Sequence, residues 1–327
     1  MMRLLNVELA RLRWRRAIVV LLLACVAIPV VLMVGYAWST RPLGDAEIAE
    51  AKQMAARDAQ QPWVAEEIEN CEADPERFFG PGVDAGECAE MITPTYENYL
   101  YRQDLDLAAV RTDVGVAAIT IMTGLMMLVG TTFAGHDWNT GSMSNQLLFE
   151  PRRLRVWVVK ALAVLAVGAA VGAGVLALFW GGVSLVAMNR DIATAPGVWS
   201  DVVATQARGV VAIAVGGLLG YALTMLFRST VATLSLMFGV SIAGSLLIVG
   251  VLGSGATRWL LPTNFFAYVL GGFDYYDDTA CTYGPDGMAT GDCMSRVSAV
   301  DGSLYLAVIV VVAVLLSLWS TQRRDVP

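Results

Sequence analysis

The chain has 327 residues, of which 56% are hydrophobic and only 16% are charged, and its formal net charge is −7. About a quarter of the residues of a soluble globular protein are charged, so the composition excludes an ordinary soluble domain. Six uncharged runs each reach the roughly 20 apolar residues that a helix needs to cross a bilayer. The sequence therefore predicts an all-α membrane protein with six transmembrane helices, at residues 17–38, 113–134, 161–188, 209–227, 229–252 and 302–321.

The N-terminal segment, residues 1–16, predicts an amphipathic elbow helix in the membrane surface. Leu5, Leu9 and Leu12 lie among basic residues, a pattern typical of helices in the headgroup layer. A simple charge cluster that sets topology explains the segment equally well. The apolar run at 17–38 is longer than that of a signal peptide, and no small-residue cleavage site follows, which favours a retained first span.

The long loop at residues 39–112 is strongly acidic, and we expect it to form a small external cap. Residues 45–71 are rich in Ala, Glu and Gln, which favours helix with an interruption at Pro62. Prolines and glycines in the remainder indicate irregular structure. Such a cap guards an exit route or binds a partner, and an ordinary solvated surface is the alternative.

A polar segment at residues 135–160 separates the second predicted span from the third. Ser142 is placed to cap a short helix that Pro151 ends. The apolar flank of this helix is formed by Met143, Leu147 and Leu148. Four basic residues, which we expect to anchor the third span at the lipid headgroups, are Arg152, Arg153, Arg155 and Lys160. A short helix with an apolar flank suits docking in a groove of a soluble partner.

The third and fourth spans, joined by a short external loop at residues 189–208, each carry a small-residue motif. Gly168 and Gly172 are four residues apart, as are Gly216 and Gly220. This spacing lets helices in a membrane approach closely. We therefore expect these glycines to lie at helix–helix contacts.

The last external loop, residues 253–301, contains an apolar stretch at 258–272 that is too short to cross a bilayer. Pro262 interrupts this stretch and two glycines end it, so we predict a re-entrant or interfacial helix. The acidic residues that follow lack the spacing of a calcium-binding loop. A short tail, residues 322–327, closes the chain.

Four of the five cysteines lie in the two large external loops, one pair in each loop. Pairs confined to one loop on the oxidising side of a membrane predict two local disulfides, Cys71–Cys88 and Cys281–Cys293. Four free thiols in a reducing compartment are the alternative. The sequence has no C-x-x-C pair and a single histidine, His136, so we expect no metal site.

The distribution of Lys and Arg predicts the orientation. If both termini are cytoplasmic, the cytoplasmic segments hold 12 of the 22 basic residues and only 4 of the 29 acidic residues. This arrangement satisfies the positive-inside rule. The acidic balance belongs to the external loops and gives no indication of nucleic-acid binding. Arginine outnumbers lysine 20 to 2, which is typical of a GC-rich bacterial genome and predicts a bacterial plasma membrane.

The spans lack the residues of several membrane activities. The runs hold no charged residue at membrane depth, which disfavours an ion-coupled carrier, and the absence of polar rings disfavours a channel. Hydrolase and P-loop signatures are missing from the sequence. The chain is therefore not expected to be an enzyme by itself, and energy for transport would come from elsewhere. Adaptable residues that suit amphipathic cargo, unless they merely pack the core, are Met122, Met126, Met127, Met225, Phe179, Trp180 and Tyr221.

The segment after the second span resembles that of ABC-2 type permeases, the membrane subunits of one class of ABC exporters. That family has an acidic residue, a Gly-Thr/Ser pair, a Leu-rich turn, a Pro/Arg pair and a lysine that opens the third span. The matching positions here are Asp137, Gly141, Ser142, Leu147, Leu148, Pro151, Arg152, Arg153 and Lys160. Aspartate replaces the usual glutamate, and the first external loop is larger than in simple members.

The resemblance implies a coupling helix that faces a separate nucleotide-binding subunit, which would bind ATP and Mg. The residues that the resemblance assigns to this contact are Asp137, Trp138, Gly141, Ser142, Leu147, Leu148, Glu150, Pro151, Arg152 and Arg153. The implied function is ATP-driven export of a drug, peptide or lipid-like substrate, with a second permease copy or a paralogous permease and membrane lipid as further partners. The other hypothesis is a non-transporting scaffold or sensor subunit of an envelope complex that binds a protein through its external loops.

Overall fold

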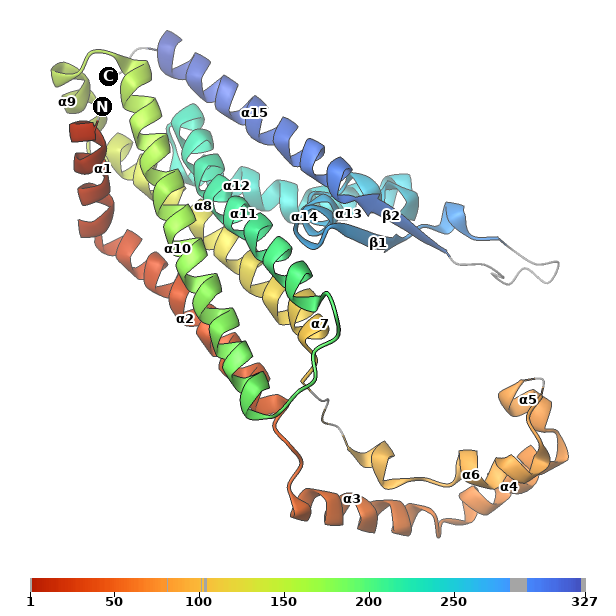
Figure 1. Ribbon diagram of the computed structural model, residues 1–327. Coiled ribbons are helices and arrows are strands. Elements are labelled where there is room, and N and C mark those ends of the chain that lie inside the picture. Colours follow the sequence, from red (N-terminus) through yellow and green to blue (C-terminus); the bar gives the residue numbers. More distant parts are fainter. Residues whose placement is uncertain (1, 81, 101, 103–104, 283–292, 325–327) are drawn as a thin grey trace. The chain divides into compact units, whose positions relative to one another are not determined.

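The computed structural model describes residues 2–80, 82–100, 102, 105–282 and 293–324. In this part of the chain, six helical segments are long and apolar enough to cross a membrane. They are Arg16–Ser39 (α2), Leu107–Asn139, Arg153–Asn189 (α10), Val198–Phe227 (α11), Thr230–Leu252 and Ala299–Arg323 (α15) (Figure 1). The prediction of a multi-pass helical membrane protein is confirmed.

Two of the spans contain a π-helical turn, a feature that is often found at functional positions. The second span consists of α7 (Leu107–Val110), a π turn at Arg111–Gly115 and α8 (Val116–Asn139). The fifth consists of α12 (Thr230–Phe238), a π turn at Gly239–Ala243 and α13 (Gly244–Leu252).

Two helices begin well before the uncharged runs that predicted them. The helix α10 begins at Arg153 rather than at residue 161, and α11 begins at Val198 rather than at residue 209. A charged side chain ends an apolar run in the sequence without ending the helix. The charged residues at these helix starts either find partners or lie at the surface, so the helical backbone continues through them.

The core of the bundle is formed by α8, α10 and α11, which pack closely through glycines. A Cβ atom on Gly220 of α11 would lie 2.1 Å from the backbone oxygen of Met127, and one on Gly168 of α10 would lie 2.9 Å from the Cα of Ala214. No side chain fits at such distances, so glycine is required for the approach. The predicted role of these small residues in helix packing is confirmed.

The fifth span differs from the core helices in its burial. Of its residues 230–252, all of which the structure describes, only Thr233 is buried. The helix α12 packs on α11 and α8, whereas α15 packs on α11 and α14 (Leu261–Leu270). The remaining faces of the fifth span are apolar and face outward.

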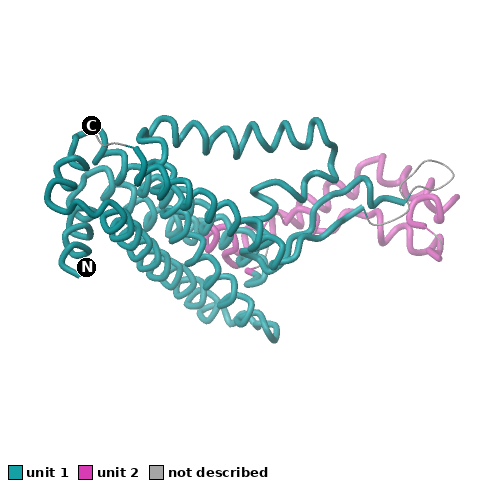
Figure 2. Tube along the Cα trace, turned by 90° about the horizontal axis from the view of Figure 1, so that it is seen from above, with its two compact units in different colours: residues 1–35, 106–327 teal, residues 36–105 magenta. Residues whose placement is uncertain are grey.

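Residues 36–105 form a separate compact unit (Figure 2). It contains α3 (Asp45–Asp58), α4 (Pro62–Ala73) and the short helices α5 (Pro75–Phe79) and α6 (Cys88–Ile92). The predicted disulfide Cys71–Cys88 joins α4 to α6. Glu47 of α3 pairs with Arg102 and Arg41. Hydrogen bonding from Arg102 is the main cause that lowers the pKa of Glu47 to about 2.

The segment before the last span contains a β-hairpin that the sequence did not predict. After the apolar helix α14, β1 (Gly272–Tyr276) pairs antiparallel with β2 (Met294–Ser298), with Tyr275 opposite Ser295. The predicted disulfide Cys281–Cys293 lies at the far end of this pair, where Asp277 N donates to Cys293 O at 2.9 Å. Both disulfide predictions are therefore confirmed.

Candidate functional site

Three fully buried ionisable residues meet at the end of the bundle that carries α1 (Met2–Trp14) and α9 (Ser142–Phe149) (Figure 1). They are Glu8 of α1, Asp137 of α8 and Lys160 of α10. Lys160 Nζ lies 2.6 Å from Asp137 Oδ2 and 2.9 Å from Glu8 Oε2. One ammonium group therefore joins an N-terminal helix to two neighbouring spans.

Arg15, at the break between α1 and α2, supplies the second positive charge. Its Nη2 donates to Asp137 Oδ1 at 2.5 Å, and its Nη1 donates to the backbone oxygen of Phe133 at 2.8 Å. The Phe133 ring also contacts both cations, with its centroid 5.1 Å from Arg15 Cζ and 4.9 Å from Lys160 Nζ. The two carboxylates thus face two cations, which is the condition for burying such charges.

The short helix α9 is attached to this ion cluster by two side chains. Ser142 Oγ donates to Asp137 Oδ1 at 2.8 Å, and Gln146 Nε2 donates to Glu8 Oε1 at 2.6 Å. Arg11 Nη1 in turn donates to Gln146 Oε1 at 3.2 Å. One face of α9 is therefore fixed by hydrogen bonds to α8 and α1. We call Glu8, Arg15, Asp137, Ser142, Gln146 and Lys160 the α9 junction.

The structure corrects the predicted role of Ser142. Gly141, with φ of 67°, precedes the first residue of α9, and Ser142 itself begins the helix. Its hydroxyl donates to Asp137 instead of accepting from the α9 backbone. The hydroxyl bonds the Asp137 carboxylate because a hydrogen bond to an ionised group is stronger than a bond between two neutral groups.

The predicted position of Lys160 at the lipid headgroups is also wrong. Its side chain is fully buried, eight residues into α10 from Arg153. Arg152 is exposed, whereas Arg153 donates to the backbone oxygen of Arg324 at 2.9 Å and so joins α10 to the end of α15. Burial of Lys160 follows from its two carboxylate partners, which replace the water that headgroups would provide.

The remaining predicted residues lie beside the junction. Glu150 pairs with Arg155 at 3.1 Å across the turn that contains Pro151. Trp138 is half-buried, and Arg228 stacks over its ring with Cζ 4.6 Å from the centroid. These groups surround α9 without entering the ion cluster. The single histidine, His136, is exposed.

The apolar flank of α9 divides into two parts. Met143 is buried, and Leu147 packs on the core. Leu148 is 80% exposed and the next residue, Phe149, is 91% exposed. The helix therefore faces the bundle on one side and presents two large apolar side chains on the other.

Four residues of the junction, Glu8, Arg15, Gln146 and Lys160, were not among the residues that the resemblance assigned to the coupling contact. The sequence could have indicated Glu8, because it is the one acidic residue among the basic residues of the segment 1–16. Its partner lies 152 positions away, so the sequence alone could not identify it.

Most of the methionine and aromatic side chains that suit amphipathic cargo pack the core, which is the alternative that the sequence left open. Six of the seven named residues are buried in the structure, among them Met122, Met126 and Tyr221. Tyr221 donates to the backbone oxygen of Trp157 at 3.1 Å, so it stabilises the contact between α11 and α10. The seventh, Met127, lines an apolar cavity.

Comparison with protein-family models, with curated proteins and with solved structures finds no match to this chain. The six spans define a multi-pass helical membrane protein. Among the described residues, no group of three or more His, Cys, Asp or Glu side chains is arranged to hold a metal ion. The α9 junction holds the cluster of buried charged residues that this part of the chain offers as a candidate functional site.

Proposed function

We propose that this chain is the permease subunit of an ATP-driven ABC exporter and that α9 is its coupling helix. The observation that carries the proposal is the two-sided character of α9. One face is tied to the ion cluster through Ser142 and Gln146, and the other presents Leu148 and Phe149. A separate ATPase subunit, with its ATP and Mg, would accept these two side chains in a groove.

The attachment of α9 supplies the mechanical link that coupling requires. A force applied at Leu148 and Phe149 reaches α8 through Asp137 and α1 through Glu8, and Lys160 carries it to α10. Buried ion pairs resist separation because an unpaired charge in this environment is costly. Movement of the ATPase subunits would therefore displace three membrane-associated helices together.

The exposed side chains suit docking into a soluble protein. An apolar patch that sits on a short helix with charged neighbours is a common form of helix-in-groove recognition. Arg152, three residues beyond the end of α9, is exposed and adds a positive charge beside the apolar patch. Positive charges at this end of the bundle also support a cytoplasmic position for α9 and both termini in a bacterial plasma membrane.

The proposal includes a second permease, either a copy of this chain or a paralogue, and amphipathic or hydrophobic cargo that is exported. The resemblance of the chain to ABC-2 type permeases rests on the order of residues from Asp137 to Lys160. The close contact of those two residues supports a common functional role for the ends of this motif.

The second candidate is a membrane scaffold that binds a protein through its external regions. The compact unit formed by residues 36–105, with its own disulfide, favours this function. A self-contained unit of this kind suits recognition of another protein, whereas a minimal permease needs only short loops.

Co-purification with the ATPase distinguishes the two candidates. The chain is expressed with the ABC-type ATPase encoded beside it, if one is present, and purified in mild detergent. We expect a stoichiometric complex that Leu148→Ala/Phe149→Ala weakens by about 30-fold or more, because a single interface hot spot already contributes about 2 kcal/mol. Trp14→Ala is the matched control, because Trp14 is 80% exposed on α1 but does not belong to α9. A complex that the double variant leaves intact would contradict the assignment of α9.

A further inference from the structure

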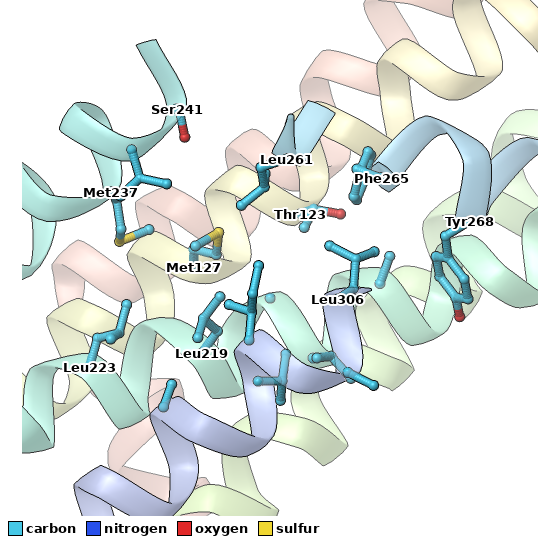
Figure 3. Close-up of a pocket in the computed structure, with 18 of the residues that line it drawn as sticks. Thr123, Met127, Leu219, Leu223, Met237, Ser241, Leu261, Phe265, Tyr268 and Leu306 are labelled. Carbon is cyan, nitrogen blue, oxygen red and sulfur yellow. The ribbon is translucent and has the colours of Figure 1, made fainter. Parts of the chain in front are cut away.

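An apolar cavity of about 530 Å³ lies among the spans, away from the α9 junction. Its walls come from α8, α11, the fifth span, α14 and α15 (Figure 3). Met127, Leu219 and Leu306 are directed toward the same space from three of these helices. The cavity lies between spans, so its surroundings are the hydrocarbon of the bilayer rather than water.

The lining of this cavity offers few polar partners. None of the described residues that line it is charged, and four carry a hydroxyl group. Two of these hydroxyls are used by their own helices, where Thr123 and Ser303 each donate to a backbone oxygen at 2.8 Å. The other two, Ser241 and Tyr268, lie well apart in the cavity (Figure 3), so they do not converge on one water molecule. A water molecule needs two to four polar partners to occupy a buried site. The cavity therefore does not favour water or a ligand with several buried hydrogen-bonding groups.

The wall formed by the fifth span is distinct from the others. Val240 and Ser241, which line the cavity, belong to the π turn at Gly239–Ala243. This span is held to the bundle through α12, which packs on α11 and α8, whereas the facing wall, α15, packs on α11 and α14. Both walls therefore pack on α11, and they differ in their second contact, which is α8 for the fifth span and α14 for α15.

We propose that this cavity binds the long hydrocarbon chain of an amphiphile. Its volume lies within the roughly 300–1,000 Å³ of small-molecule sites, and its lining offers dispersion contacts without demanding hydrogen bonds. Met127 and Met237, on α8 and α12, supply flexible side chains that adapt to a chain of variable shape. The inference does not depend on coupling to an ATPase, because it rests on the cavity alone.

Photolabelling with a palmitic-length fatty acid that carries a mid-chain diazirine tests the proposal. The full chain is placed in nanodiscs, irradiated and digested, and the labelled residues are mapped by mass spectrometry. We expect saturable labelling at Leu219, Met237 and Val240 that unlabelled oleate competes away. Equal, non-competable labelling of outward residues such as Leu185 and Val203, which are 68% and 65% exposed, would overturn the proposal.

Two cavity-filling variants provide the specific comparison. Leu219→Trp fills the site from α11, and Ala307→Trp fills it from α15, where the native residue is already exposed and the folding cost is small. Because the chain would come from the bilayer, a filler acts by removing dispersion contacts, and loss of about ten such contacts should reduce competable labelling about tenfold. Leu185→Trp, outside the cavity, should have no effect. Unchanged labelling in a folded filled variant would contradict the assignment.

The source of the chain is identified in the same preparations. Native mass spectrometry of the detergent-purified protein should find a retained phospholipid, lost in the filled variants, if a bilayer lipid is the occupant. Competition by oleate without a retained phospholipid would assign the site to a single-chain amphiphile. Absence of both would overturn the proposal.

Discussion

Lys160 Nζ lies 2.6 Å from Asp137 Oδ2, and this contact joins the beginning of one span to the end of the span before it. The same ammonium group reaches Glu8, so three helices share one buried cation. The helix α9, which lies between the two spans in the sequence, is attached to the same carboxylates. The ion cluster is thus both a structural element of the bundle and the support of α9.

Replacement of Lys160 by Met should destabilise the bundle by about 3–5 kcal/mol, because two buried carboxylates would lose a partner. Thermal unfolding in detergent measures the loss. Arg155→Met is the matched control: Arg155 forms a partly exposed pair with Glu150 and should cost no more than about 1 kcal/mol. Glu8→Leu in the Lys160→Met background should recover part of the stability. Equal melting temperatures for Lys160→Met and the control would show that the cluster is not buried as described.

Gln146→Leu should separate attachment of α9 from binding of the ATPase. The change leaves Leu148 and Phe149 in place but removes the amide that donates to Glu8 Oε1 at 2.6 Å. We expect the ATPase to remain bound while its stimulation by cargo declines. Asn145→Ala, at an exposed neighbouring position of α9, should preserve stimulation. Loss of ATPase binding in Gln146→Leu would instead assign Gln146 to the interface.

The reactivity of the cysteines should change sharply on reduction. Cys25 is fully buried, and the other four cysteines form the two disulfides. A maleimide should therefore not label the native oxidised protein, whereas mild reduction should expose up to four reactive thiols. Peptide mapping without reductant should recover Cys71 with Cys88 and Cys281 with Cys293. Labelling of Cys25 in the native state would contradict its packing in the core.

The compact unit at residues 36–105 should lose stability in acid. The pKa of Glu47 is lowered from 4.5 to about 2, mainly by the hydrogen bond from Arg102. A carboxyl with a depressed pKa stabilises the folded state above its unfolded pKa, and this contribution is lost as the pH falls toward 2. Hydrogen exchange of the α3 amides in the full chain should therefore accelerate, relative to the intrinsic rate, as the pH falls from about 4.5 toward 2. Glu47→Gln should weaken this dependence, whereas the exposed Glu50→Gln should retain it.

The class of protein and the disulfides could be predicted from the sequence because local features determine them. Bilayer thickness fixes the length of a spanning helix, and each cysteine pair lies within one loop. The ion cluster is different, because Glu8 and Lys160 are 152 positions apart and only the packing of α1 on α10 brings them together. The sequence predicted a headgroup anchor at Lys160 because Arg152, Arg153 and Arg155 shortly precede it.

The β-hairpin was missed, and the sequence left open which methionines pack the core, for related reasons. The strands Gly272–Tyr276 and Met294–Ser298 are short, and their pairing depends on a contact between segments that polar sequence separates. Met126 and Met127 are adjacent, yet one is fully buried and the other lines the cavity. Composition cannot distinguish them, since the helix face that each occupies is set by the neighbouring spans.

Site-specific photocrosslinking from position 149 tests whether α9 docks on an ATPase subunit. A benzoylphenylalanine replaces Phe149 in the native host, in which any ABC-type ATPase partner is present, and the same probe at Trp14 serves as the comparison. The proposed function predicts an adduct between position 149 and the ATPase, and a much weaker one from position 14. Adducts from position 149 that contain only lipid or another membrane protein would contradict a coupling role for α9.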